Sequence, residues 1–283
     1  MDPVSNPYAP GAGTPPPELA GRDEIREKVR VAIARVQRGN TAKSVLMIGL
    51  RGVGKTVLLD QMKLDADHEG HCTIRAEVPE HRSLPALLAP QLRLAMLRLS
   101  RVDKARDMAQ KALRALSGFV KALKVTYSDI EVGIDFDPEP GLADNGDLEG
   151  DLTILLSQAG LAAQNAGVSL VLFIDELQYI DESQFGALIS ALHRCNQLKL
   201  PVLLVGAGLP QLRAVAGNAK SYAERLFDYP EIGALSREAA ADAIVIPAHI
   251  ENVAFEEAAV DDIVQRTGGY PYFLQEWVKH AWD

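Results

Sequence analysis

The chain has 283 residues, of which 47% are hydrophobic and 24% are charged, and its formal net charge is -9. This length suits one large α/β domain, alone or with a small second domain. No apolar run approaches the roughly 20 residues of a membrane span, and no signal peptide is recognisable, so we expect a cytoplasmic protein without membrane contact. The negative total argues against nucleic-acid binding over the whole surface, although a local basic patch can still bind it. Cys72 and Cys195 show no metal-ligand spacing and are predicted to be free thiols.

The N-terminal segment, residues 1–17, carries six of the sixteen prolines and almost no charge. This composition predicts an extended or disordered lead-in. An amphipathic helix is expected after it, because Ile25, Val29, Ile33 and Val36 recur at three- or four-residue spacing up to a break near Gly39.

A phosphate-binding loop is predicted next, in the stretch SVLMIGLRGVGKTVLLD that begins at Ser44. It contains the pattern G-x-x-x-x-G-K-T, between an apolar strand and a helix-forming run. Such a loop converges backbone N–H groups on an anion. Its lysine supplies a charge for the β- and γ-phosphates, and its threonine hydroxyl holds Mg²⁺. The expected nucleotide-binding residues are Gly49, Arg51, Gly52, Val53, Gly54, Lys55, Thr56 and Val57.

A charged region of about residues 82–150 follows a predicted strand at 71–78. Helices are expected at about 86–100 and 102–124, and the segment 125–136 is a candidate hairpin or edge strand. The basic residues of 82–124 are either a solvated helix surface, partly neutralised by the acidic segment 129–151, or a contact surface for a protein or DNA partner. They are Arg82, Arg93, Arg98, Arg101, Lys104, Arg106, Lys111, Arg114, Lys121 and Lys124.

Two carboxylates end the next predicted strand, at 169–174, which is apolar throughout and so fits a central parallel strand. Ligands bind at that end of a strand in open α/β sheets. Asp175 is therefore expected to order Mg²⁺ together with Thr56, and Glu176 to orient the attacking water. With Lys55, the pair favours hydrolysis of ATP over mere binding.

The rest of the chain is expected to form helices at 183–198 and 210–216, a buried strand at 200–205 and a short strand near 227–232. Residues 236–283 are expected to be helical throughout. We therefore predict a nucleotide-binding domain at 18–235, with the charged region as an insertion, and a small helical domain at 236–283.

Arg225 precedes the last predicted strand and is a candidate arginine finger that reaches the γ-phosphate of a neighbouring subunit. Two other readings are open at this point: an ion pair with Glu224 or Asp228, or a solvated surface residue.

The segments PPPELAGRDE, ERLF and TGGYPYFLQ, together with the two phosphate-site motifs, resemble the AAA+ ATPases. The resemblance runs from Pro15 to the C-terminus and is strongest to the branch with the Orc1/Cdc6-like and STAND-type ATPases. It implies a P-loop NTPase three-layer α/β sandwich with a five-stranded parallel sheet of order 5-1-4-3-2, covered by a C-terminal helical lid. It also implies that Ala20 and Arg22 lie near the adenine, and that Tyr270 and Pro271 of the lid touch the nucleotide.

Two departures from the family pattern favour slow turnover of ATP. Gly206-Ala207-Gly208 stands where a polar sensor residue is usual, and Gly269-Tyr270-Pro271 stands where many members carry a sensor arginine. We therefore expect a nucleotide-controlled switch for oligomerisation or partner binding, using ATP or ADP with Mg²⁺. The alternatives are a DNA-acting ATPase, such as a replication loader or transposition regulator, and a nucleotide-binding scaffold with negligible turnover. Relatives often carry a further domain after the lid, so two readings are open: a bare ATPase module, or part of a longer natural chain.

Overall fold

The computed structural model describes residues 2–8, 10–11, 13–80, 82–130 and 136–283. Its strands form one parallel sheet with the spatial order β2-β3-β4-β1-β5, which is the predicted order read from the other edge. The strands are β1 (Ser44–Ile48), β2 (Cys72–Glu77), β3 (Leu170–Asp175), β4 (Val202–Gly208) and β5 (Phe227–Asp228). The helices are α1 (Asp23–Gln37), α2 (Lys55–His68), α3 (Leu84–Leu99), α4 (Arg106–Leu123), α5 (Leu148–Ala166), α6 (Glu182–Gln197), α7 (Leu212–Ala219), α8 (Ala223–Leu226), α9 (Arg237–Ile250), α10 (Glu257–Thr267) and α11 (Pro271–Trp282).

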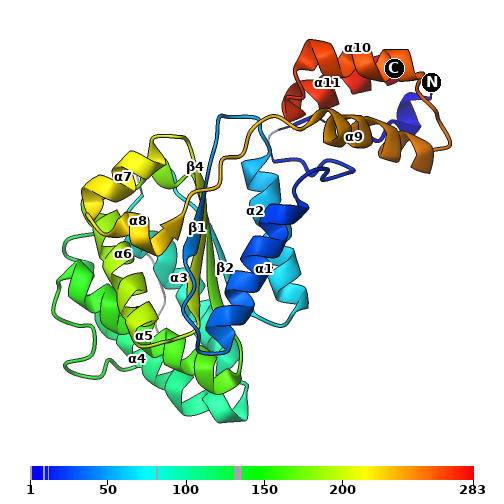
Figure 1. Ribbon diagram of the computed structural model, residues 1–283. Coiled ribbons are helices and arrows are strands. Elements are labelled where there is room, and N and C mark those ends of the chain that lie inside the picture. The colour runs from blue at the N-terminus through cyan, green and yellow to red at the C-terminus, as the bar shows by residue number, and fades with distance from the viewer. Residues whose placement is uncertain (1, 9, 12, 81, 131–135) are drawn as a thin grey trace.

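The sheet is buried on both faces, as the apolar strands require (Figure 1). Alternate residues of each strand point to opposite faces. Val45, Met47 and Phe173 pack with α1 and α2 on one side. Leu46, Leu172 and Leu204 pack into the larger core that α3, α4, α5 and α6 build on the other side. This arrangement is the predicted three-layer α/β sandwich.

Short polar side chains fix where several helices begin. Ser83, Asp147, Asp181 and Ser236 each accept a hydrogen bond from a backbone N–H in the first turn of α3, α5, α6 and α9. The caps of α3 and α6 place these helices within a few residues of the predicted ranges 86–100 and 183–198. The last strand is shorter than expected, ending at Asp228 with only an isolated bridge at Glu231, because the intervening Pro230 has no N–H to donate.

The predicted basic helices are present as α3 and α4, on the side of the sheet away from α1 and α2 (Figure 1). Residues 125–130 form turns and no strand, so this part of the candidate hairpin is wrong; residues 131–135 lie outside the described residues. Among the described ion pairs, one joins the basic helices to the acidic segment: Arg114 lies 3.6 Å from Glu139.

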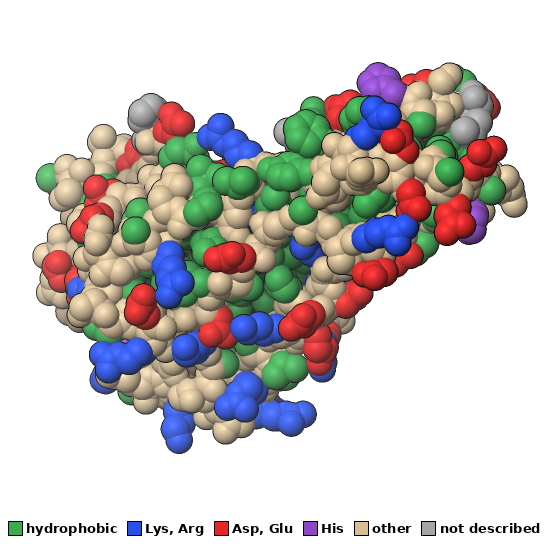
Figure 2. All heavy atoms as spheres, turned by 45° about the horizontal axis from the view of Figure 1, so that its top comes forward, with side chains coloured by type: hydrophobic (Ala, Val, Ile, Leu, Met, Phe, Trp, Pro, Cys, Tyr) green, Lys and Arg blue, Asp and Glu red, His purple; other side chains and the backbone are tan. Residues whose placement is uncertain are grey.

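The last three helices form a separate small core, which includes Ile244, Val260, Leu274 and Trp282. They project as a lobe from the α/β domain, with a notch between the two parts on the face drawn in Figure 2. On that face acidic side chains gather on the lobe, and Lys and Arg gather at the far end of the α/β domain. We call α9–α11 the lid.

The N-terminal segment, predicted to be extended or disordered, packs against the lid in its described residues (Figure 1). Tyr8 is 2% exposed, and the centroid of its ring lies 6.0 Å from that of Trp282. Its hydroxyl donates to the carbonyl of Ile244. Asn6 donates to the carbonyl of Lys279 and to the carboxylate of Asp283. One aromatic ring in a proline-rich stretch is enough to anchor it, because a buried tyrosine removes a large apolar surface from water.

Both cysteines are free and buried, as predicted. None of the described helices combines the length and the apolar character that crossing a membrane requires.

Candidate active site

The phosphate-binding loop lies between β1 and α2, at the edge of the sheet where the parallel strands end. Gly52 and Gly54 have φ values of 79° and 88°, in the left-handed region that glycine adopts without strain. Gly49 meets a different demand, since a Cβ there would lie 2.2 Å from the carbonyl oxygen of Ile232. The three glycines of the loop, Gly49, Gly52 and Gly54, are therefore required by backbone conformation or by close packing.

Lys55 is the first residue of α2, and its side chain turns back over the loop. Its Nζ donates to the carbonyl oxygens of Gly49, at 2.9 Å, and Leu50, at 2.8 Å. Burial lowers the pKa of Lys55, whereas the carboxylates of Glu176 and Asp175 act in the opposite direction. The ammonium group thus lies in the field of both predicted catalytic carboxylates.

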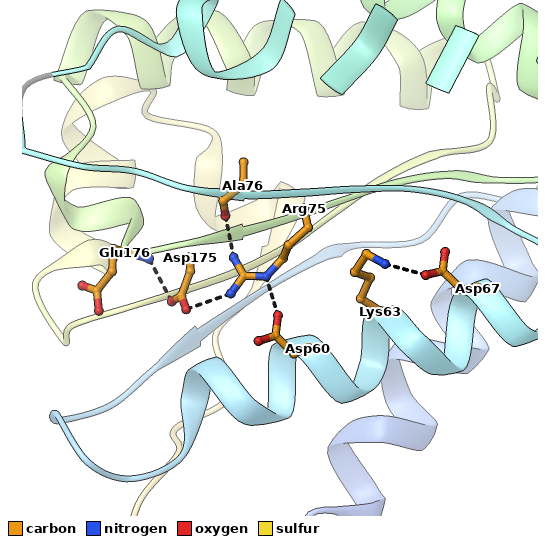
Figure 3. A network of polar contacts seen from close by, with 7 residues as sticks. All are labelled: Asp60, Lys63, Asp67, Arg75, Ala76, Asp175 and Glu176. Atoms are coloured by element: carbon orange, nitrogen blue, oxygen red, sulfur yellow. Dashed lines mark hydrogen bonds and ion pairs between the residues drawn. The ribbon is translucent and has the colours of Figure 1, made fainter. Parts of the chain in front are cut away.

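Asp175 ends β3 and is almost fully buried, at 1% exposure. Figure 3 shows its charge partner, Arg75 of the neighbouring β2, whose Nη2 lies 3.3 Å from Asp175 Oδ2. Arg75 also forms an ion pair with Asp60 of α2 and donates to the carbonyl of Ala76. Sequence analysis missed Arg75, although a charged residue inside the apolar run HCTIRAEV is a usable signal.

Glu176 has a φ of 54°, so the chain bends sharply just after β3. Its carboxylate accepts a hydrogen bond from the side-chain amide of Gln178, in the 3-10 helix η3 (Leu177–Tyr179). Glu176 lines the cavity described next, whereas Asp175 is almost fully buried and is not among the lining residues. The two consecutive carboxylates therefore face different surroundings, as their positions at a strand end predict.

A cavity of about 490 Å³ opens beside the loop. Its walls bring together most of the predicted nucleotide-binding residues, from the N-terminal region, the loop and the lid. Those residues are Ala20, Arg22, Arg51, Gly52, Val53, Gly54, Lys55, Thr56, Val57 and Pro271.

Two predicted residues, Gly49 and Tyr270, support this cavity without lining it. The N–H of Gly49 donates to the carbonyl of Gly208, at 3.2 Å, and so ties the loop to the end of β4. The hydroxyl of Tyr270 donates to the carbonyl of Arg51, and the N–H of Tyr272 donates to the carbonyl of Gly52, at 3.2 Å. The lid is thus hydrogen-bonded directly to the phosphate-binding loop.

The N-terminal segment supplies a wall of the cavity that sequence analysis did not anticipate, through Pro10, Gly11, Gly13, Thr14 and Pro16. Arg22, just after it, donates to the carbonyls of Gly233, at 2.6 Å, and Val53, at 3.3 Å. Burial lowers the pKa of Arg22. The guanidinium therefore fastens the segment to both the loop and the chain leading to the lid.

Arg225 lies on α8, exposed and outside the cavity. The predicted ion-pair partners are engaged elsewhere, Glu224 with Arg213 and Asp228 with Lys28 and Lys43. No ion pair of Arg225 occurs among the described residues. Its ion-pair reading is therefore not supported, and its role toward a neighbouring subunit stays a prediction.

The residues present fit a nucleotide with Mg²⁺. The loop offers backbone N–H groups and the N-terminus of α2 to phosphate. The Thr56 hydroxyl and the Asp175 carboxylate are the hard oxygen donors that Mg²⁺ prefers. Arg75 already pairs with the buried carboxylate of Asp175, so Mg²⁺ at this site would compete with the arginine for that carboxylate.

Comparison with known proteins agrees with this geometry. The family model described as "AAA ATPase domain" matches residues 18–205, which is more than half of the chain. No curated protein matches the chain in sequence.

Solved structures with a similar fold have low sequence identity. The Walker-type ATPase paby2304 of Pyrococcus abyssi has a TM-score of 0.56 and 13% identity, over 97% of this chain and 71% of that one. The replication initiator DnaA, bound to AMPPCP and single-stranded DNA, has a TM-score of 0.51 and 13% identity, over 93% of this chain and 61% of that one. The chain thus spans about three fifths of the DnaA structure, and at such identity the likeness establishes the fold alone.

Proposed function

Because the chain belongs to the AAA ATPase domain family, we propose that it binds ATP with Mg²⁺ in the cavity beside the phosphate-binding loop and hydrolyses it slowly. We further propose that the bound nucleotide acts as a switch for self-association or for binding of a partner in the cytoplasm. The observation that carries the proposal is the convergence of Lys55, Thr56 and Glu176 on one cavity, with the buried Asp175 adjacent to Glu176 at the end of β3.

Each of these residues has a distinct task in the proposed reaction. Lys55 exchanges its bonds to the loop carbonyls for bonds to the β- and γ-phosphates, whose charge it balances. Glu176 orients a water molecule for attack on the γ-phosphate and accepts its proton. Thr56 and Asp175 hold Mg²⁺, which neutralises charge that develops on the phosphate oxygens.

The contacts between lid and loop support a switch. Tyr270 and Tyr272 bond to the carbonyls of Arg51 and Gly52, so a change in the loop on nucleotide binding changes the bonds that hold the lid. The N-terminal segment lines the same cavity and packs on the lid through Tyr8. The proposed signal therefore runs from the phosphates to the lid and to the surfaces it presents.

The test combines nucleotide binding, phosphate release and size-exclusion chromatography with light scattering. Lys55→Ala should abolish ATP binding, and Glu176→Gln should keep binding while stopping phosphate release. The Glu176→Gln variant is then compared with ADP and with ATP plus Mg²⁺. A larger species only with ATP supports a self-association switch. A monomer under both conditions contradicts that switch, and ATP binding by Lys55→Ala contradicts the nucleotide site.

A DNA-acting ATPase is the second candidate, and the exposed basic side chains of α3 and α4 favour it. Arg98 of α3 and Lys121 of α4 are exposed, and so are Arg101 and Lys104 in the connection between these helices. The structurally similar DnaA is described as bound to single-stranded DNA. Phosphate neutralisation by such residues makes DNA binding strongly salt-dependent. Retention on DNA that falls steeply with salt, and is lost in Arg101→Glu with Lys104→Glu, would support this candidate. Retention unchanged by that double reversal would contradict it.

A further inference from the structure

Gln178 connects the proposed catalytic carboxylate to the end of the neighbouring strand. It lies in η3, two residues after Glu176. Its Nε2 donates to Oε2 of Glu176, and its Oε1 accepts a hydrogen bond from the backbone N–H of Leu209, at 3.0 Å. Leu209 directly follows β4. One side chain therefore bridges the ends of β3 and β4.

The orientation of this amide follows from its partners. The N–H of Leu209 can only donate, so the oxygen of the Gln178 amide must face it. The NH₂ group then points to Glu176, whose ionised carboxylate can only accept. A hydrogen bond to an ionised group is stronger than one between neutral groups, so the arrangement restricts the Glu176 side chain.

The end of β4 is shaped to receive the Gln178 amide. A Cβ at Gly208 would lie 2.7 Å from Gln178 Oε1, and a Cβ at Gly206 would lie 2.3 Å from a methyl group of Leu177. The carbonyl of Gly208 in turn accepts the N–H of Gly49. Glu176, Gln178, the end of β4 and the phosphate-binding loop thus form a continuous hydrogen-bonded connection, in which the glycines leave room for η3.

We propose that Gln178 is a positioning residue for ATP hydrolysis, holding the Glu176 carboxylate in the orientation from which it directs the attacking water. This inference rests on the proposed function. It gives a physical reason for Gly208 at the end of β4: the amide of Gln178 occupies space that a side chain at this position would need.

The direct test uses Gln178→Glu and Gln178→Ala in a steady-state assay of phosphate release. Gln178→Glu keeps an acceptor for Leu209 but loses the donor to Glu176, whereas Gln178→Ala loses both. Displacing a catalytic group by about 1 Å costs up to roughly a hundredfold, so kcat should fall by about tenfold or more in both variants. The KM for ATP and the affinity for ADP should stay within about twofold. A kcat for Gln178→Glu within about twofold of the wild type would overturn the proposal.

Gln184 offers a matched control, because its amide oxygen also accepts a backbone N–H, that of Leu84, at 2.6 Å, but outside the cavity. Gln184→Ala should lower stability without lowering kcat. Amide hydrogen exchange at Leu209 separates positioning from a structural role: it should accelerate in Gln178→Ala and stay slow in Gln178→Glu. If kcat falls only in the variants in which amide exchange at Leu209 accelerates, Gln178 only stabilises the end of β4, and the proposal is overturned.

A double-mutant cycle keeps this inference distinguishable from the proposed function. Thermal unfolding midpoints of Glu176→Ala, Gln178→Ala and the double variant report the coupling of the two side chains without turnover. We expect the midpoint of the double variant to fall by less than the sum of the decreases in the two single variants. If hydrolysis is absent from the wild type, the proposed function fails; if the shifts are additive, this inference fails whatever the rate of hydrolysis.

Discussion

The guanidinium of Arg75 lies between the carboxylates of Asp175, from β3, and Asp60, from α2 (Figure 3). Its Nη2 lies 3.3 Å from Asp175 Oδ2, and its Nε donates a hydrogen bond to Asp60 Oδ1. Asp175 is 1% exposed, so Arg75 acts as the built-in counterion of a buried charge. A carboxylate without such a partner costs several kcal/mol to bury. Any cation bound by Asp175 must therefore share the carboxylate with this arginine.

Replacing Arg75 by Met is expected to have opposite effects on stability and on metal binding. Without Mg²⁺ the buried Asp175 loses its partner, which should destabilise the fold by about 3 kcal/mol in urea unfolding. The concentration of Mg²⁺ that half-saturates nucleotide binding should fall, because the competing positive charge is gone.

Arg26→Met is the control for this substitution, since it breaks a partly exposed pair with Asp65 at 3.0 Å. Such pairs contribute about 1 kcal/mol or less. Equal losses of stability in the two variants would show that Asp175 does not depend on Arg75.

Gly52→Ala should weaken the contact between the loop and the lid. The φ of Gly52 is 79°, and an added Cβ would lie 3.2 Å from side-chain atoms of Tyr270 and Tyr272. Backbone strain of about 1–3 kcal/mol is expected, together with faster proteolysis of the segment leading to the lid. Gly217→Ala is the matched control, because a Cβ there meets nothing within 4 Å and helical Ala is favoured over Gly. Equal proteolysis of the two variants would contradict the prediction.

Arg225→Ala should reduce phosphate release only where the protein self-associates. The side chain is exposed and lies outside its own cavity, so it can serve only a neighbouring site, where an arginine finger contributes several powers of ten in rate. Rates are compared across a dilution series that spans the association range. An equal loss in the dilute monomer would rule out a finger acting between subunits.

Tyr8→Ala should loosen the lid more than Tyr8→Phe does. Truncating this buried ring removes contacts with Phe255 and Trp282, at a cost of about 3–5 kcal/mol. Tyr8→Phe loses only the hydroxyl bond to Ile244, about 1 kcal/mol. Both tryptophans lie in α11, so tryptophan fluorescence reports lid unfolding directly. Unfolding midpoints unchanged in Tyr8→Ala would show that the segment is not anchored.

The buried phenol of Tyr8 also predicts that the lid becomes less stable at alkaline pH. Burial raises the pKa of Tyr8 to about 12, from an ordinary value of 10. A raised folded pKa means that the stabilisation is complete below about pH 10 and is lost as the pH rises toward 12. The difference in stability between the wild type and Tyr8→Phe should therefore shrink over that interval. A constant difference would contradict the role of the neutral phenol.

His71 should make the fold sensitive to mild acid. Burial lowers its pKa below 6.5, against the opposing effect of Glu69, and its Nδ1 accepts the N–H of Ser169 at 3.3 Å. The unfolded chain therefore binds more protons at this site below about pH 6.5, so stability falls as the pH falls. His71→Asn keeps an acceptor that does not titrate, and its urea midpoint should decline less between pH 7 and 5. Parallel curves for the two proteins would contradict this prediction.

The sequence alone determined the sheet and the core of the site. Its apolar strands and the G-x-x-x-x-G-K-T pattern are local signals, because strand burial and loop conformation depend on residues close together in the chain. Gly49 to Thr56 and the pair Asp175-Glu176 could therefore be placed at one sheet edge. The order of the strands came from the resemblance to the AAA+ ATPases, and the structure confirms it.

Only the tertiary structure revealed the partners of these residues. Arg75 meets Asp175, Gln178 meets Leu209, and Tyr8 meets Trp282 across 100, 31 and 274 positions of the chain. No periodicity encodes such pairs, since each depends on which strands and helices become neighbours once the sheet has formed. The packing of the N-terminal segment could not be predicted for the same reason: its composition indicates an extended or disordered segment, whereas the lid core provides a partner for the ring of Tyr8.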